Sequence, residues 1–297
     1  MTGLEAHYGW ALLSVICAGT FSFILKVGVE RTHSSALLNA IASLVAMVLA
    51  FGSAIVFDFR YEWSVVLLGI FSGALYIVGG IARSDALAYI HSALYFPLYK
   101  VIGTTVVLIV GIFYFGDHLT WIQIVGLVLV LLVPILLIDK VETLRQKDLM
   151  RGIWLTVTSA ILISISALGG KVVTTLGSSI YVFLIINYFV SAVGQSSFYV
   201  SKSKDTGLKV QKKEIIIVAF LLGIFQYLGF MTLLVAYKTG EVSLVYAINS
   251  TYIVIPILLS IWFYREHWNI RKACAIGLSV VSVCCCDRRC PSMQLLC

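Results

Sequence analysis

Three lysines lie inside long apolar stretches of the sequence, namely Lys26, Lys100 and Lys171. A lysine at the centre of a lipid bilayer costs about 2.5–3.5 kcal/mol on insertion scales, so it needs a partner, water or a route to the headgroups. Lys26 and Lys171 lie toward the ends of their stretches, where the side chain either snorkels to the headgroups or faces an internal cavity. Lys100 lies deeper, three residues after Pro97, where snorkelling is harder. These lysines indicate a polar site inside an apolar molecule.

Uncharged polar side chains occur in the same stretches. Amides within a membrane either join helices by hydrogen bonds or contact a bound solute, and the sequence leaves both interpretations open. Tyrosines near them offer a ring and a hydroxyl to a small amphiphilic solute. The candidate solute-binding residues are Lys100, Tyr95, Gln226, Tyr246, Asn249, Lys26, Lys171, Asn39 and Asn187.

The composition explains why these polar residues are unusual. The chain has 297 residues, of which 60% are hydrophobic and 12% charged, with a mean hydropathy of +1.01. Soluble domains are roughly 45–50% apolar and about 25% charged. A soluble enzyme or nucleic-acid module of this size is therefore excluded. The net charge of +7 comes mostly from loop residues, so we expect the lipid bilayer and not a nucleic acid as the partner of the basic side chains.

Ten apolar stretches predict ten transmembrane helices, at about 20 residues for each crossing. They cover residues 9–29, 36–57, 63–82, 93–114, 119–138, 152–175, 179–200, 215–235, 243–263 and 271–286. All six tryptophans fall at or beside a predicted helix end, where the indole ring favours the headgroup layer. Pro97 and Pro256 lie within stretches and predict kinks. Arg83 and Asp85 flank a short connection and are interpreted as a local surface ion pair.

The two halves of the chain resemble one another. Trp10 matches Trp154, Lys26 matches Lys171 with a one-residue slip, and the segment LLGIF occurs at 67–71 and again at 221–225. Five helices in each half require the copies to have opposite orientations in the membrane. We therefore expect an all-α polytopic membrane protein in which residues 8–140 and 150–285 form two inverted five-helix repeats. Residues 286–297, with their cysteines, are expected to be a disordered tail.

Two long segments carry a family resemblance. HSALYFPLYKVIGTTVVLIVGIFYFGDHLTWIQIVGLVL in the first half and AYKTGEVSLVYAINSTYIVIPILLSIWFYREHWN in the second resemble the EamA-type branch of the drug/metabolite transporter superfamily. The resemblance covers about residues 8–285. It implies a ten-helix carrier with a central cavity between the halves. The second apolar stretch, residues 36–57, departs from the family pattern. It lacks the arginine that is common in the family, and Asn39 and Ser43 lie near that position.

The resemblance implies a secondary-active transporter of the plasma (inner) membrane. We expect it to export a small organic metabolite, such as an amino acid, by alternating access. A non-transporting scaffold or receptor built on a carrier fold is the alternative. The sequence contains no HExxH, GxSxG or Walker motif, so we expect no enzymatic activity, no cofactor and no metal. Without a nucleotide-binding motif, we expect a coupling ion, such as the proton, to supply the energy for transport. The basic residues favour termini outside the cell, whereas the resemblance implies termini inside.

Overall fold

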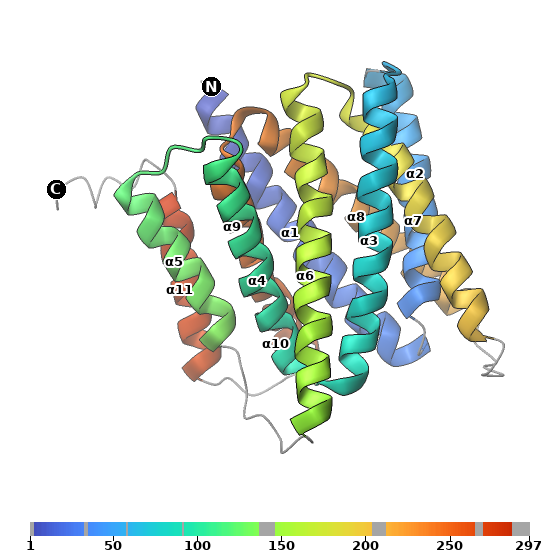
Figure 1. The fold of residues 1–297 in the computed structure, drawn as a ribbon. Coiled ribbons are helices and arrows are strands. Elements are labelled where there is room, and N and C mark those ends of the chain that lie inside the picture. The colour runs from blue at the N-terminus through green and yellow to red at the C-terminus, as the bar shows by residue number, and fades with distance from the viewer. Residues whose placement is uncertain are drawn as a thin grey trace.

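The computed structural model describes residues 3–32, 35–57, 59–90, 92–136, 146–203, 212–264 and 270–286, and every regular element within these ranges is a helix. The elements are arranged side by side in one bundle (Figure 1). In chain order they are α1 (Gly3–Thr32), α2 (Ser35–Phe57), α3 (Trp63–Tyr89), α4 (Ser92–Phe113), α5 (Trp121–Leu136), α6 (Gln146–Thr175), α7 (Ile180–Ser203), α8 (Lys212–Thr239), α9 (Val242–Ser250), the 3₁₀ turn η1 (Thr251–Ile253), α10 (Val254–Tyr264) and α11 (Ile270–Cys286).

Eight segments of the described chain are long and apolar enough to cross a membrane, and two shorter apolar helices, Trp121–Val133 in α5 and Ala273–Cys286 in α11, accompany them. The ninth predicted stretch is a single span, Val242–Phe263, that η1 divides into α9 and α10. The prediction of an all-α polytopic membrane protein is confirmed. The expected tail lies outside the described residues from 287 onward, while Cys285 and Cys286 are buried at the end of α11.

The first helices of the two halves, α1 and α6, run in opposite directions. In Figure 1, α1 descends from the N-terminus, whereas α6 ascends from the opposite face of the bundle. The hydroxyl of Tyr8 in α1 donates a hydrogen bond of 2.7 Å to the backbone carbonyl of Cys286 in α11. The start of the first helix and the end of the last therefore lie at the same face.

Helix contacts repeat when the halves are exchanged. α1 packs against α8 and α6 against α3, and the pair α2–α8 corresponds to the pair α7–α3. Two further pairs, α2–α7 and α5–α11, join equivalent helices of the two halves and lie at opposite edges of the bundle (Figure 1). This pattern supports the proposal that residues 8–140 and 150–285 are inverted repeats.

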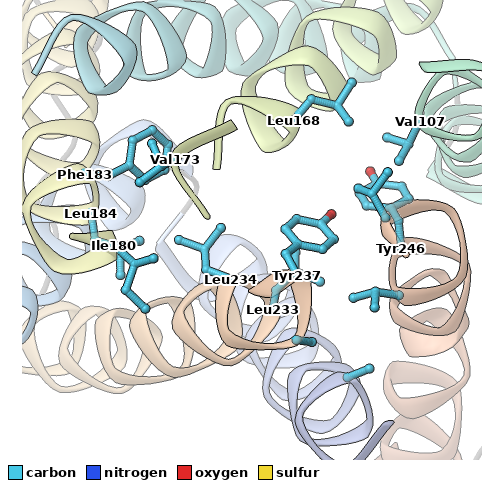
Figure 2. Close-up of a cluster of buried hydrophobic side chains, with 14 of the residues drawn as sticks. Val107, Leu168, Val173, Ile180, Phe183, Leu184, Leu233, Leu234, Tyr237 and Tyr246 are labelled. Carbon is cyan, nitrogen blue, oxygen red and sulfur yellow. The ribbon is translucent and has the colours of Figure 1, made fainter. Parts of the chain in front are cut away.

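Buried apolar side chains fill the space between these pairs. Figure 2 shows Phe183 of α7, Val173 of α6 and Leu234 of α8 directed toward one another, with Tyr237 and Tyr246 on the side of α9. Many large apolar side chains on the outside are exposed, as expected for surfaces that contact lipid tails. The interior is therefore closed by apolar packing except where the polar residues described below interrupt it.

The break in the ninth span lies against α1. Pro256 cannot donate a backbone hydrogen bond, which frees the carbonyl of Tyr252 one turn earlier. A Cβ atom at Gly19 would lie 3.0 Å from that carbonyl oxygen and 2.5 Å from Cβ of Ile255. The absence of a side chain at Gly19 thus lets α1 approach the broken segment closely.

Substitution of Gly19 tests this contact. We expect Gly19→Ala to lower the free energy of unfolding by about 1–3 kcal/mol, because the added methyl group overlaps a β-branched side chain in a packed interior. Gly52→Ala is the matched control, since Gly52 also lies within a helix and a Cβ atom there meets no atom within 4 Å. Thermal unfolding of the two purified variants in detergent measures the difference. Equal unfolding midpoints would contradict the close contact between Gly19 and the segment around Ile255.

Candidate functional site

Lys100 lies in the interior of the bundle. Its side chain is 5% exposed, and its Nζ lies 4.0 Å from the ring centroid of Tyr252 and 5.6 Å from that of Tyr246. In the described part of the chain it makes no hydrogen bond or ion pair. A desolvated cation over an aromatic face gains about 2 kcal/mol, which does not fully offset an insertion cost of about 2.5–3.5 kcal/mol. The ammonium can therefore still donate hydrogen bonds to an anionic or polar partner.

Two tyrosines on the same helix lie beside this lysine. Tyr95 is fully buried, and its hydroxyl lies 3.1 Å from Oγ of Ser159 in α6. Its ring stacks on that of Tyr99, with centroids 5.7 Å apart and planes 18° from parallel. Residues four apart lie on one face of a helix, so α4 directs both rings to the same region.

Arg83 lies near the end of α3 and is half-buried. Its charge is within electrostatic range of Tyr76, Tyr95, Tyr99 and Tyr252, and Tyr99 is within range of Tyr246. We call the five residues Tyr76, Tyr95, Tyr99, Tyr246 and Tyr252 the tyrosine cage. The sequence interpretation of Arg83 and Asp85 as a local surface ion pair stays a prediction.

A pocket adjoins the tyrosine cage between α2, α3 and α7. Its cavity volume is about 20 Å³, and its lining is Ala36, Asn39, Tyr76, Ile77, Gly80, Ile81, Arg83, Gln195 and Phe198. Tyr76 and Arg83 thus belong to both the pocket and the contacts of the cage. Oδ1 of Asn39 is buried and has no hydrogen-bond partner in the described structure. Asn39, which the sequence analysis names as a candidate site residue, therefore lines the same pocket as Arg83, and its Oδ1 can accept a hydrogen bond.

Asn187 and Asn249 are held in contacts between helices. Nδ2 of Asn187 donates to Oγ of Ser72 at 2.8 Å, and Nδ2 of Asn249 donates to Oγ of Ser14 at 2.6 Å. Ser14 donates onward to the carbonyl of Gly229 at 2.8 Å. These bonds favour the helix-joining interpretation of both amides. Their predicted role in solute binding stays a prediction.

Lys171 binds the end of a helix. Its Nζ donates to the backbone carbonyls of Tyr237 and Gly240 at 2.8 and 2.9 Å, where the last turn of α8 carries unpaired carbonyls. Asp117 and Glu241 lie close enough to attract the same ammonium. Oδ2 of Asp117 also accepts the backbone N–H of Ser243 at 2.7 Å, at the start of α9. This cluster ties α6 and the α4–α5 connection to the α8–α9 junction.

The two remaining candidate residues, Lys26 and Gln226, do not bind a helix end as Lys171 does. Lys26, the sequence counterpart of Lys171, is exposed. Gln226 has a buried Oε1 with no hydrogen-bond partner among the described residues, while its backbone carbonyl accepts from the hydroxyl of Tyr188 at 3.1 Å. The structure thus places Lys100 near the ring of Tyr246, whereas Tyr95 packs with Ala86, Ile90 and Tyr99. Solute binding by these residues stays a prediction. Within the described residues, no group of three or more His, Cys, Asp or Glu could hold a metal ion.

Comparison with known proteins agrees with this architecture. A solved structure described as "Crystal structure of protein" superposes with a TM-score of 0.78 at 15% sequence identity, covering 98% of this chain and 99% of that chain. The two chains therefore share a fold over nearly their full lengths. No curated protein matches the sequence. Residues 150–286 match the model of the EamA-like transporter family.

The helices define a multi-pass membrane protein. The family whose model matches the second half of the chain, residues 150–286, is part of the drug/metabolite transporter superfamily.

The hydrogen bonds of Lys171 give a second stability test. We expect Lys171→Met to lower the free energy of unfolding by about 1.5–3 kcal/mol, because it removes charge-assisted hydrogen bonds to carbonyls at the end of α8. Lys26→Met is the matched control, since its side chain is exposed. A chemical-denaturation series in detergent measures the difference. If both variants unfold at the same midpoint, Lys171 does not stabilise this junction.

Proposed function

We propose that this protein is a secondary-active transporter that exports a small organic metabolite by alternating access around the tyrosine cage. The observation that carries the proposal is the buried ammonium of Lys100, which has no hydrogen bond or ion pair in the described chain although membrane-crossing helices surround it. Ionisable residues inside membrane bundles are costly and mark paths for solutes or ions. A scaffold would not require such a group.

The broken ninth span offers a place for movement. Discontinuous helices near the middle of the membrane are a common feature of carriers with inverted repeats. Here the 3₁₀ turn η1 carries Tyr252, whose ring centroid lies 4.0 Å from Nζ of Lys100. A change in the turn would therefore alter the cage directly. We place the exchange between the outward and inward states in a rocking of the two repeats, residues 8–140 and 150–285, about this region.

The energy source and the membrane complete the proposal. The sequence has no nucleotide-binding motif, so uphill export would draw on an ion gradient, for which we propose the proton gradient. The plasma (inner) membrane is the site at which such a gradient and an export route coincide. Amino acids are the first solutes to assay, alongside other small metabolites.

Transport by reconstituted protein tests the proposal. We expect proteoliposomes that contain the wild-type chain to exchange at least one radiolabelled metabolite of a broad panel. Lys100→Ala should reduce its rate at least tenfold while the yield of folded protein stays near normal, because the substitution removes the only charge of α4 from the cage. Lys238→Ala, which alters an exposed lysine at the end of α8, should keep the wild-type rate.

Two results would contradict the proposal. Unchanged exchange by Lys100→Ala would move the solute site elsewhere in the bundle. Wild-type protein that binds solutes but moves none across the bilayer would favour a receptor.

A further inference from the structure

The junction between α8 and α9 brings two helix ends together beside the start of α1. A Cβ atom at Gly240 would lie 3.1 Å from Cδ2 of His7 in α1. We call the face of the bundle at which α1 begins and α11 ends the terminal face, so the junction lies at this face. The last carbonyls of a helix and its first N–H groups have no partner within that helix. Both helix ends at the junction therefore need partners from elsewhere.

Side chains of two other elements supply these partners. Nζ of Lys171 in α6 donates to the backbone carbonyls of Tyr237 and Gly240, at 2.8 and 2.9 Å. Oδ2 of Asp117, in the α4–α5 connection, accepts the backbone N–H of Ser243 at 2.7 Å. A cation at the C-terminal end of a helix and a carboxylate at the N-terminal end both match the helix dipole. Lys171 thus caps the end of α8, and Asp117 caps the start of α9.

The two caps differ in what they connect. Lys171 and the carbonyls that it binds all belong to the second of the two proposed repeats, so they move as one body. Asp117 belongs to the first repeat and caps a helix of the second. The N-cap residue of α9, Glu241, makes no capping hydrogen bond with its own side chain. Rocking of the repeats would therefore separate Asp117 from Ser243 and leave the contact of Lys171 intact.

Close packing surrounds the contact of Asp117. Its backbone N–H donates to the carbonyl of Gly111 at 3.0 Å, which fixes the connection to the end of α4. A Cβ atom at Gly111 would overlap Oγ of Ser243 and would lie 3.0 Å from Cγ1 of Val242. Val242 and Ser243 are both fully buried. The end of α4 and the start of α9 therefore close upon one another at the terminal face.

We propose that Asp117 is the latch of a gate at the terminal face: its bond to the start of α9 holds α4 and α9 together, and this bond breaks when the repeats rock apart. Lys171 keeps the α8–α9 junction folded in both states. The inference rests on the proposed transport function and adds a gate to it. Asp117 is a positioning residue in this scheme, because it acts through α9 and does not touch the solute.

Cysteine labelling of full-length protein in detergent tests the latch. Val242→Cys reports on the gate, because Val242 is the buried first residue of α9. Val65→Cys is the matched reference, since Val65 is equally buried near the start of α3. A water-soluble methanethiosulfonate is the reagent, and site-resolved mass spectrometry separates these positions from the native cysteines. Adding Asp117→Ala should accelerate labelling at Val242→Cys at least tenfold and leave the rate at Val65→Cys unchanged.

Two further variants and a second measurement sharpen the test. Asp117→Asn keeps an oxygen acceptor, so its labelling rate should lie below that of Asp117→Ala. Asp148→Ala is the matched control and should keep the wild-type rate, because it removes a carboxylate from the first turn of α6, at the opposite face of the bundle (Figure 1). Hydrogen exchange of residues 240–250 reads the opening without an introduced cysteine, and Asp117→Ala should make it at least tenfold faster.

The outcomes distinguish the latch from the proposed function. Labelling and hydrogen exchange that stay unchanged in Asp117→Ala would overturn the latch and leave transport standing. Equal acceleration at Val65→Cys would overturn it as well, since the substitution would then loosen the whole bundle, and so would an Asp117→Asn variant no slower than Asp117→Ala. Selective opening at Val242→Cys in a protein that moves no solute across the bilayer would keep the latch and overturn the proposed function.

Discussion

The contact between the ammonium of Lys100 and the rings of Tyr252 and Tyr246 constrains the centre of the molecule. It brings α4 together with α9 and η1, the region where the ninth span is interrupted. A charge buried at this depth is costly, and aromatic faces reduce that cost without removing it. The rings of Tyr252 and Tyr246 are the groups that the structure places nearest this charge.

The rest of the bundle compensates by close contact between small residues. Hydrogen bonds between serines and amides join α1 to α8 and α9, and α3 to α6 and α7. Lipid tails are as apolar as leucine, so helices in a membrane gain more from such close and polar contacts than from burying apolar surface. The stability of the outer pairs thus leaves the centre free to hold a costly polar site.

The sequence could predict the helices better than the site. Long apolar stretches locate spans because a bilayer demands about 20 apolar residues for each crossing. Pro256 follows the 3₁₀ turn Thr251–Ile253, which interrupts the α-helix of the ninth span, and the predicted kink stays a prediction. The partners of Asn187 and Lys171 could not be predicted, because they lie 115 and 66–69 residues away along the chain. Lys26 and Lys171 match in sequence, yet one is exposed and the other is buried at a helix end.

The central claim is that a solute binds beside Lys100 within the tyrosine cage. The most direct measurement is a crystal structure of the protein with 3-(4-bromophenyl)propanoate, using the anomalous scattering of bromine to locate the ligand. The account predicts a bromine peak inside the tyrosine cage, with the carboxylate within hydrogen-bonding distance of Nζ of Lys100. A peak confined to the lipid-facing surface, with the cage holding no ligand density, would contradict it.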